Sequence, residues 1–105
     1  MFQINGIYWL IKWVHPYNNV LLRKDGTYTV GICDNKTKTI SLSDNLEGSM
    51  LKKVLTHEIV HAAMFSYNVY LTLEQEEVIA DIIATYGEEI INITNKVFKK
   101  LRYYS

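Results

Sequence analysis

The chain has 105 residues, of which 49% are hydrophobic and 21% are charged, and its formal net charge at pH 7 is zero. This is the composition of a single globular domain spanning residues 1–105, and with no excess of positive charge neither nucleic acid nor an anionic membrane is an expected partner. Cys33 is the only cysteine, so no disulfide can form within the chain and a cytoplasmic location is expected.

Residues 6–14, "GIYWLIKWV", show the alternation of a β-strand that has one strongly apolar face. Trp9 and Trp13 lie on that face and are expected to anchor a core or an interface, because large aromatic side chains dominate burial. The N-terminal apolar run is short, lacks a basic leader and is interrupted by Lys12, so neither a secretory signal nor a membrane span is predicted.

Two hairpins are predicted after this strand. Asp25-Gly26 is a strong tight-turn signal, because both central positions of a type I′ turn need positive φ, and it separates residues 19–23 from residues 27–33. Cys33, at the end of the second of these strands, is expected to be a small buried side chain. Residues 39–43, "TISLS", complete the second hairpin. The N-terminal part of the chain is therefore predicted to form a small antiparallel sheet.

A first helix is predicted to begin at Asp44, because Asp44 and Glu47 together have the form of a helix N-terminus. This helix is expected to run to about Tyr67. Asn68 is suited to the left-handed position that follows a helix end.

A second helix is predicted over residues 73–86, where Thr72 and Gln75 form a capping-box pattern at its start. Gly87 is expected to end or bend this helix before a third segment at residues 88–101. A small antiparallel sheet followed by two or three helices is an α+β fold.

The first predicted helix contains His57, Glu58 and His61 within the run "VLTHEIVHAAMF". At ~100° per residue the two imidazoles lie ~40° apart and one turn along the axis, so both point to the same side. That side is apolar, and the residues that share it are Met50, Val54, Met64 and Phe65. Burying a polar ring without a partner costs about 1–3 kcal/mol, so both rings need partners there.

A zinc ion is the partner that this pattern favours. Zinc binds neutral imidazole nitrogen, and the i, i+4 spacing lets His57 and His61 reach one tetrahedral centre. The Glu58 carboxylate then lies beside the metal, where it can take a proton from the attacking water. Residues 57–61 are thus the H-E-x-x-H motif of zinc peptidases. The alternative interpretation is two core histidines with satisfied hydrogen bonds and an exposed Glu58.

A third ligand is expected on the second predicted helix. Glu77 and Asp81 share a face, so Glu77 can bind the metal while Asp81 hydrogen-bonds a ligand histidine. Glu76 is the main competitor for the ligand position, because helix register is known only to within a residue. Otherwise Glu74 and Glu76 are interpreted as an acidic first turn that complements the helix dipole. His15 also remains possible, although it lies in an expected loop far upstream.

The segments "HEIVH" and "EEVIAD" together resemble the gluzincin pattern H-E-x-x-H … E-x-x-x-D. Over residues 28–90 the chain more particularly resembles ImmA/IrrE-type metallopeptidase domains and the small phage-encoded proteins related to them. The roles that this resemblance implies are His57, His61 and Glu77 as zinc ligands, Glu58 as general base and Asp81 as support for a ligand. It also implies a zincin-like fold and cleavage of a protein, often a cytosolic regulator.

The expected function is therefore zinc-dependent hydrolysis of peptide bonds in a cytosolic protein substrate. The candidates for a side chain that donates a hydrogen bond to the oxyanion are Tyr67, Tyr70 and Tyr86, although Tyr86 is expected to face the core. Residues 39–43 are expected to offer a free strand edge to an extended substrate.

A non-catalytic binding module is the alternative function, for example a phage factor that binds a host protein and uses zinc only to stabilise a small fold. Glu58 distinguishes the two functions, because a structural site does not need an acid at that position.

Overall fold

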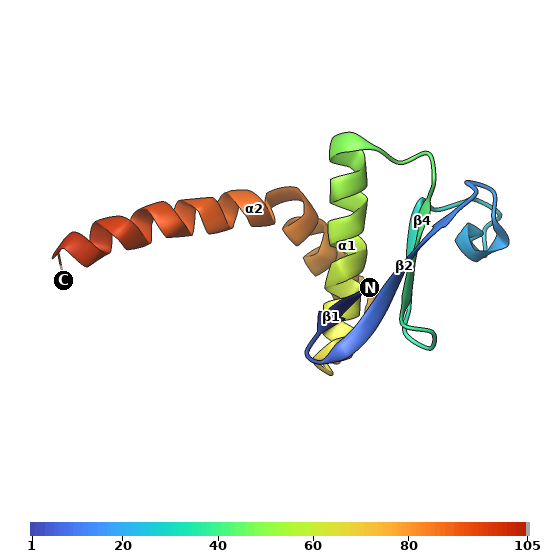
Figure 1. Ribbon diagram of the computed structural model, residues 1–105, viewed down its shortest axis with the longest axis horizontal. Helices are drawn as coiled ribbons and strands as arrows, with labels where there is room; N and C mark the ends of the chain where they lie inside the picture. Colours follow the sequence, from blue (N-terminus) through green and yellow to red (C-terminus); the bar gives the residue numbers. More distant parts are fainter. Residues whose placement is uncertain (105) are drawn as a thin grey trace.

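The computed structural model describes the backbone of residues 1–104 and the side chains of residues 1–102. Within these residues a small sheet comes first and two helices follow it (Figure 1). The elements are β1 (Phe2–Ile4), β2 (Ile7–Val14), the short 3-10 helix η1 (Asn19–Leu21), β3 (Gly31–Asp34), β4 (Thr39–Ser43), α1 (Gly48–Ser66) and α2 (Leu73–Tyr104). The predicted α+β class is confirmed.

The sheet is mixed and not antiparallel throughout. Its strand order is β1-β2-β4-β3, in which β2 and β4 run parallel while the two outer pairs are antiparallel. β4 is therefore an inner strand, and β3 forms one edge of the sheet. The prediction was wrong for the central pair because side chains alternate between the two faces of a strand in the same way whatever the direction of its neighbour.

The tight turn of the N-terminal hairpin lies at Asn5-Gly6, between β1 and β2. Both residues have positive φ, at 50° and 77°, as a type I′ turn requires. The hairpin predicted around Asp25-Gly26 forms only in part, since Leu22 and Tyr28 make an isolated bridge. The 3-10 helix η1 takes the place of its first strand.

The core lies between the sheet and α1. Its fully or almost fully buried members are Trp9, Ile40, Leu42 and Ala62. Trp9 is a core anchor as predicted, and its indole Nε1–H donates to Ser66 Oγ on α1 at 2.8 Å. Trp13 is 51% exposed and so is not part of the core, whereas the neighbouring Val14, on the other face of β2, is buried.

The first helix begins at Gly48, four residues later than predicted. The backbone N–H of Asp44 donates to Val14 O at 2.8 Å, and this bond keeps the residue with the sheet. Glu47 is the N-cap in an extended conformation, without a hydrogen bond from its side chain. At the other end Asn68 has a φ of 55°, which confirms the predicted left-handed position.

The second helix begins with the predicted capping box. Gln75 N donates to Thr72 Oγ1 at 3.2 Å, and Thr72 N donates to Gln75 Oε1 at 3.1 Å. Gly87 lies inside α2 and does not end it, so the third predicted segment belongs to the same helix. The N-terminal part of α2 packs against α1, and the rest projects away from the body of the molecule (Figure 1). With this projection included, the molecule is 56 Å long.

Neither α1 nor α2, as far as the structure describes them, contains the length of apolar sequence that a membrane crossing requires.

Candidate metal centre

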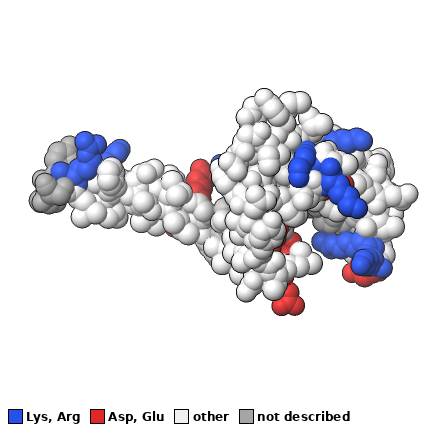
Figure 2. Space-filling model, turned by 90° about the horizontal axis from the view of Figure 1, so that it is seen from below, with Lys and Arg blue, Asp and Glu red and all other residues white. Residues whose placement is uncertain are grey.

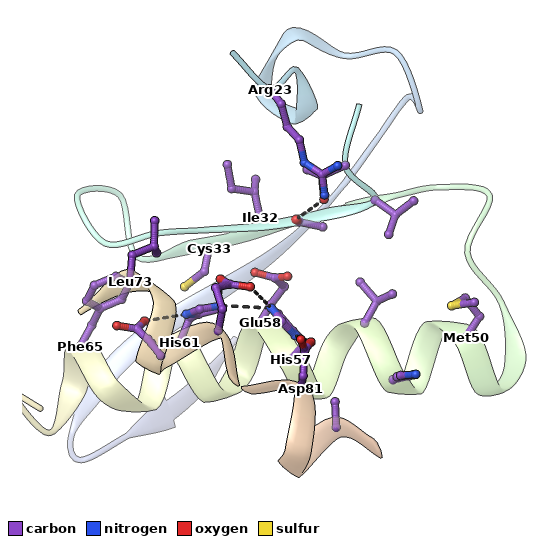
Figure 3. Close-up of a pocket in the computed structure, with 18 of the residues that line it drawn as sticks. Arg23, Ile32, Cys33, Met50, His57, Glu58, His61, Phe65, Leu73 and Asp81 are labelled. Atoms are coloured by element: carbon purple, nitrogen blue, oxygen red, sulfur yellow. Dashed lines mark hydrogen bonds and ion pairs between the residues drawn. The ribbon is translucent and has the colours of Figure 1, made fainter. Parts of the chain in front are cut away.

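Two helices build the candidate site, with β3 beside it (Figure 3). α1 contributes both histidines of the H-E-x-x-H motif, and the first turns of α2 contribute the acids. Ala80 is fully buried where α2 crosses α1, against Val60 and Met64. Because alanine is small, the two helix backbones can approach closely at this point, and the side chains of both helices can reach a common centre.

His57, His61 and Glu77 converge as predicted. His57 Nε2 lies 3.2 Å from His61 Nε2 and 3.2 Å from Glu77 Oε2. His61 Nε2 lies 2.8 Å from Glu77 Oε1. One ligand atom from each of the three residues lies within 4.8 Å of the others, so the group can hold a metal ion.

The two histidine nitrogens are spaced as ligands of one tetrahedral ion. With metal–ligand distances of ~2.0–2.1 Å, the donors around a tetrahedral zinc are about 3.3–3.4 Å apart. The two Nε2 atoms are 3.2 Å apart, and the Glu77 carboxylate contacts both rings, through Oε2 at 3.2 Å from His57 and through Oε1 at 2.8 Å from His61. The donor set fits zinc, which accepts both imidazole nitrogen and carboxylate oxygen.

Each histidine also contacts a second carboxylate through its other ring nitrogen. His57 Nδ1 lies 3.0 Å from Asp81 Oδ1, which is the contact predicted for Asp81. His61 Nδ1 lies 2.6 Å from Glu76 Oε1. A neutral imidazole that donates its Nδ1–H to a carboxylate has its Nε2 lone pair free for a metal. These contacts therefore orient both rings as ligands.

Glu76 has a different role from either of those predicted. It is 9% exposed, so it is not a solvated acid of the first turn, and it binds the far side of the His61 ring and not the ligand position. Glu74 is exposed, as the helix-dipole interpretation expects. Adjacent acids on a helix point ~100° apart, so Glu76 and Glu77 can reach the two nitrogens of one ring, but which acid reaches which nitrogen depends on the rotation of α2 relative to α1.

Glu58 lies beside the ligands on the β3 side of α1. It is 7% exposed, which contradicts the interpretation that leaves this residue in solvent. Burial raises the pKa of its carboxyl, and the nearby His57 and His61 oppose part of that effect. A glycine on β3 leaves room for this side chain, because a Cβ at Gly31 would lie 3.3 Å from Glu58 Cγ.

A cavity of about 820 Å³ opens over the site between α1, α2 and β3. Figure 3 shows Arg23 reaching toward it from the loop above the sheet, with Phe65 and Leu73 at one end and Met50 at the other. Neither Arg23 nor Gly31 was singled out from the sequence, because their place at the cavity depends on how the loop and β3 fold over α1. The cavity is large enough for several side chains of a bound peptide.

Two sequence-based expectations about the surroundings of the site, those for residues 39–43 and for Tyr86, are wrong, and the open alternative of His15 as a ligand is excluded. β4 is flanked by β2 and β3, so residues 39–43 have no free edge, and the edge beside the cavity is β3. His15 is exposed and accepts a hydrogen bond from Tyr17 N through Nδ1 at 3.1 Å, so it is not the third ligand. Tyr86 is 55% exposed and does not face the core.

The tyrosines proposed as oxyanion donors do not lie at the site. Among the side chains that the structure describes, those of Tyr67, Tyr70 and Tyr86 are not part of the cavity lining, and all three are exposed.

Cys33 lies on β3 with its thiol toward the cavity (Figure 3). It is half-buried and packs against the core cluster around Trp9, in partial agreement with its predicted role. Burial and the neighbouring Glu58 carboxylate raise the pKa of the thiol to about 12.

Comparison with known proteins assigns the chain to no family. No family model matches it, and no curated protein or solved structure does so either. The chemical interpretation of the site therefore depends on its own residues and their geometry.

Proposed function

We propose that the protein is a zinc-dependent metallopeptidase that hydrolyses peptide bonds of a cytosolic protein substrate. One observation carries the proposal: the Nε2 atoms of His57 and His61 meet the Glu77 carboxylate beside a buried Glu58. Catalytic zinc sites have three protein ligands and leave the fourth position to water, whereas structural zinc sites have four protein ligands. The three donors found here, with a carboxylate beside them that is not itself a ligand, match the catalytic arrangement.

His57, His61 and Glu77 would hold the metal. When bound, zinc supplies a Lewis acid that lowers the pKa of water and polarises a carbonyl oxygen. Asp81 and Glu76 would fix the orientation of the two imidazoles and place their remaining proton on Nδ1, because each carboxylate lies within hydrogen-bond distance of the Nδ1 of one ring.

Glu58 is the proton carrier in this proposal. Its carboxylate accepts a proton from the attacking water and then donates it to the nitrogen that leaves when the amide C–N bond breaks. The raised pKa of Glu58 supports this role, since a carboxyl group with an elevated pKa retains the proton long enough to pass it on. β3 is an edge strand of the sheet and lines the adjacent cavity, so an extended peptide bound there would pair with its outer side.

The alternative of a non-catalytic binding module explains Glu58 less well. Burying a carboxylate costs free energy, and a zinc site that only stabilises the fold would gain nothing from this residue. The same position is essential if water must be deprotonated next to the metal.

The test is hydrolysis of a proteome-derived peptide library, read out as new peptide termini by mass spectrometry. We expect the zinc-loaded protein to generate new termini and Glu58→Gln to lower the rate by roughly 10²–10⁴-fold with its zinc content unchanged. Glu74→Gln is the matched control, because Glu74 is an exposed acid on α2, and this variant should retain full activity. A zinc-loaded wild-type protein that cleaves no peptide, or cleavage that Glu58→Gln leaves unchanged, would contradict the proposal and favour the binding module.

A further inference from the structure

The projecting half of α2 carries an apolar stripe along its length. The stripe consists of Tyr86, Ile90, Ile93 and Val97, which are between 48% and 55% exposed. Successive members are separated by four, three and four residues, which is the a/d spacing of helices that pack side by side. We call these four residues the α2 stripe.

The face opposite the stripe is polar and consists of Glu88, Asn92, Asn95 and Lys99. This segment is therefore amphipathic while its apolar stripe stays about half-exposed. A helix that projects into solvent does not need an apolar face, and most of the stability of helices in proteins comes from packing such a face against another surface. Both facts indicate that another surface covers the α2 stripe.

The charge distribution along the segment indicates what that surface is. Its acids, Glu88 and Glu89, lie at the base of the projection, and its Lys and Arg residues lie toward the tip. Glu88 forms an ion pair with Lys52 of α1 at 2.7 Å, so Glu89 is the acid considered for pairing with another copy. Figure 2 shows this polarity, with acidic atoms near the base, basic atoms near the tip and an uncharged surface between them. A second copy that runs antiparallel brings the acidic base of each helix to the basic tip of the other, whereas a parallel copy would place like charges together.

The residue register fits the antiparallel arrangement in detail. With Ile90 of one copy opposite Ile93 of the other, Tyr86 falls opposite Val97 and the apolar layers are continuous. In the same register Glu89 of each copy lies beside Lys96 of the other. These two residues occupy equivalent positions next to the stripe, one heptad apart, so two complementary pairs form by symmetry.

We propose that the α2 stripe is the interface through which two copies of this chain form an antiparallel dimer. Leu101 flanks the stripe and extends the contact, because the tip of each helix then reaches the part of the other α2 that is packed on its own body. Ile91 and Phe98 lie more than 100° from the stripe and stay outside this interface. The dimer does not depend on the proposed peptidase function, since no residue of the stripe contacts the metal centre.

Sedimentation equilibrium tests the dimer. The wild-type chain is expected to have twice its chain mass of 12.2 kDa at high micromolar concentration. Ile93→Asp should weaken dimerisation by about 100-fold or more, because it places a charge in the central layer. Asn95→Asp is the matched control, since it adds the same charge on the polar side of the same turn, and it should leave the dimer unchanged. Zinc content and circular dichroism show that each variant is folded.

A charge exchange tests the direction of pairing. Lys96→Glu alone should weaken the dimer about tenfold, because both pairs become repulsive, and the Glu89→Lys/Lys96→Glu double variant should restore it. A dimer that Lys96→Glu strengthens, or that the double variant fails to restore, would overturn the antiparallel arrangement. A wild-type chain that remains monomeric, or a dimer that survives Ile93→Asp, would show that the α2 stripe is not a dimer interface. The stripe would then be a surface for binding a different protein or a lipid membrane.

Discussion

The two histidines of the candidate metal centre are each held at both ring nitrogens. Nε2 faces the common centre, and Nδ1 contacts a carboxylate from α2, Asp81 for His57 and Glu76 for His61. A ring fixed in this way loses little rotational freedom when it binds a metal, so the carboxylates contribute to affinity without touching the ion.

Loss of the Glu76 carboxylate should therefore weaken metal binding. We expect Glu76→Gln to lower zinc affinity by about 10–100-fold, because the amide is a weaker acceptor for His61 Nδ1–H. The measurement is a competition titration against a zinc-binding dye. Glu74→Gln is the control, since Glu74 is exposed on the same helical turn. Equal affinities for the two variants would show that the Glu76 contact does not orient the ligand.

Cys33 should be unreactive in the folded protein. Burial raises the pKa of its thiol to about 12, so almost no thiolate, the reactive form, is present at pH 8. We expect the metal-free native protein to react slowly with a thiol-specific disulfide reagent at pH 8, and the same protein in guanidinium chloride to react at the rate of a free thiol. Rapid reaction of the native protein would mean that the thiol is not desolvated.

At the level of single residues, most of the candidate site could be predicted from the sequence. His57, Glu58 and His61 follow from spacing on one helix, and Glu77 and Asp81 from spacing on the next, because side-chain direction along a helix is a local property. The role of Glu76 could not be resolved, because it depends on the rotation of α2 relative to α1.

Among the elements, the approach of β3 to α1 determines the space that Glu58 occupies. A Cβ at Gly31 would lie only 2.8 Å from Val54 Cγ1 on α1, which is closer than side chains tolerate. The absence of a side chain at Gly31 thus lets the edge strand approach the helix at Glu58.

Gly31→Ala should consequently destabilise the protein by about 1–3 kcal/mol, because strand and helix must separate. Chemical denaturation of Gly31→Ala, Val54→Ala and the double variant measures this effect. Val54→Ala removes the atom that the new Cβ would contact. We therefore expect Gly31→Ala to lower the free energy of unfolding by at least about 0.5 kcal/mol less in the Val54→Ala variant than in the wild type. Strictly additive free energies of unfolding would show that the two residues do not collide.

Whether a segment forms a strand or a helix could be predicted from the sequence, but the neighbour against which it packs or pairs could not. The capping box at Thr72 and the left-handed Asn68 are local signals, and both are present in the structure. The direction of β4 was not predictable, because parallel and antiparallel strands share one pattern. Gly87 did not end α2, since a glycine costs a helix interior only about 1 kcal/mol and the helix on both sides offsets that cost.

For the whole molecule, the candidate metal centre spans the two helices, with both histidines on α1 and Glu77 on α2. Metal that binds only the folded state adds about 4 kcal/mol to the free energy of unfolding when its concentration is 1,000 times its dissociation constant. We expect a chelator to lower the thermal midpoint of the wild-type chain and of the His15→Ala control, but not that of His61→Ala. A wild-type midpoint that is insensitive to the chelator would mean that no metal links the helices.

The overall shape was the least predictable property. The apolar pattern of residues 86–97 is equally compatible with a helix packed on the sheet, and only the structure shows that this segment projects from the body (Figure 1). Sequence patterns identify an apolar face but not the surface that covers it.

The most direct test of the central claim is zinc stoichiometry of the purified chain and three variants by elemental analysis. We predict about one zinc per chain in the wild type and in Glu58→Gln, and large losses in His61→Ala and Glu77→Ala. Zinc retained in full by Glu77→Ala, or lost from Glu58→Gln, would contradict the assignment of three ligands and a separate proton carrier.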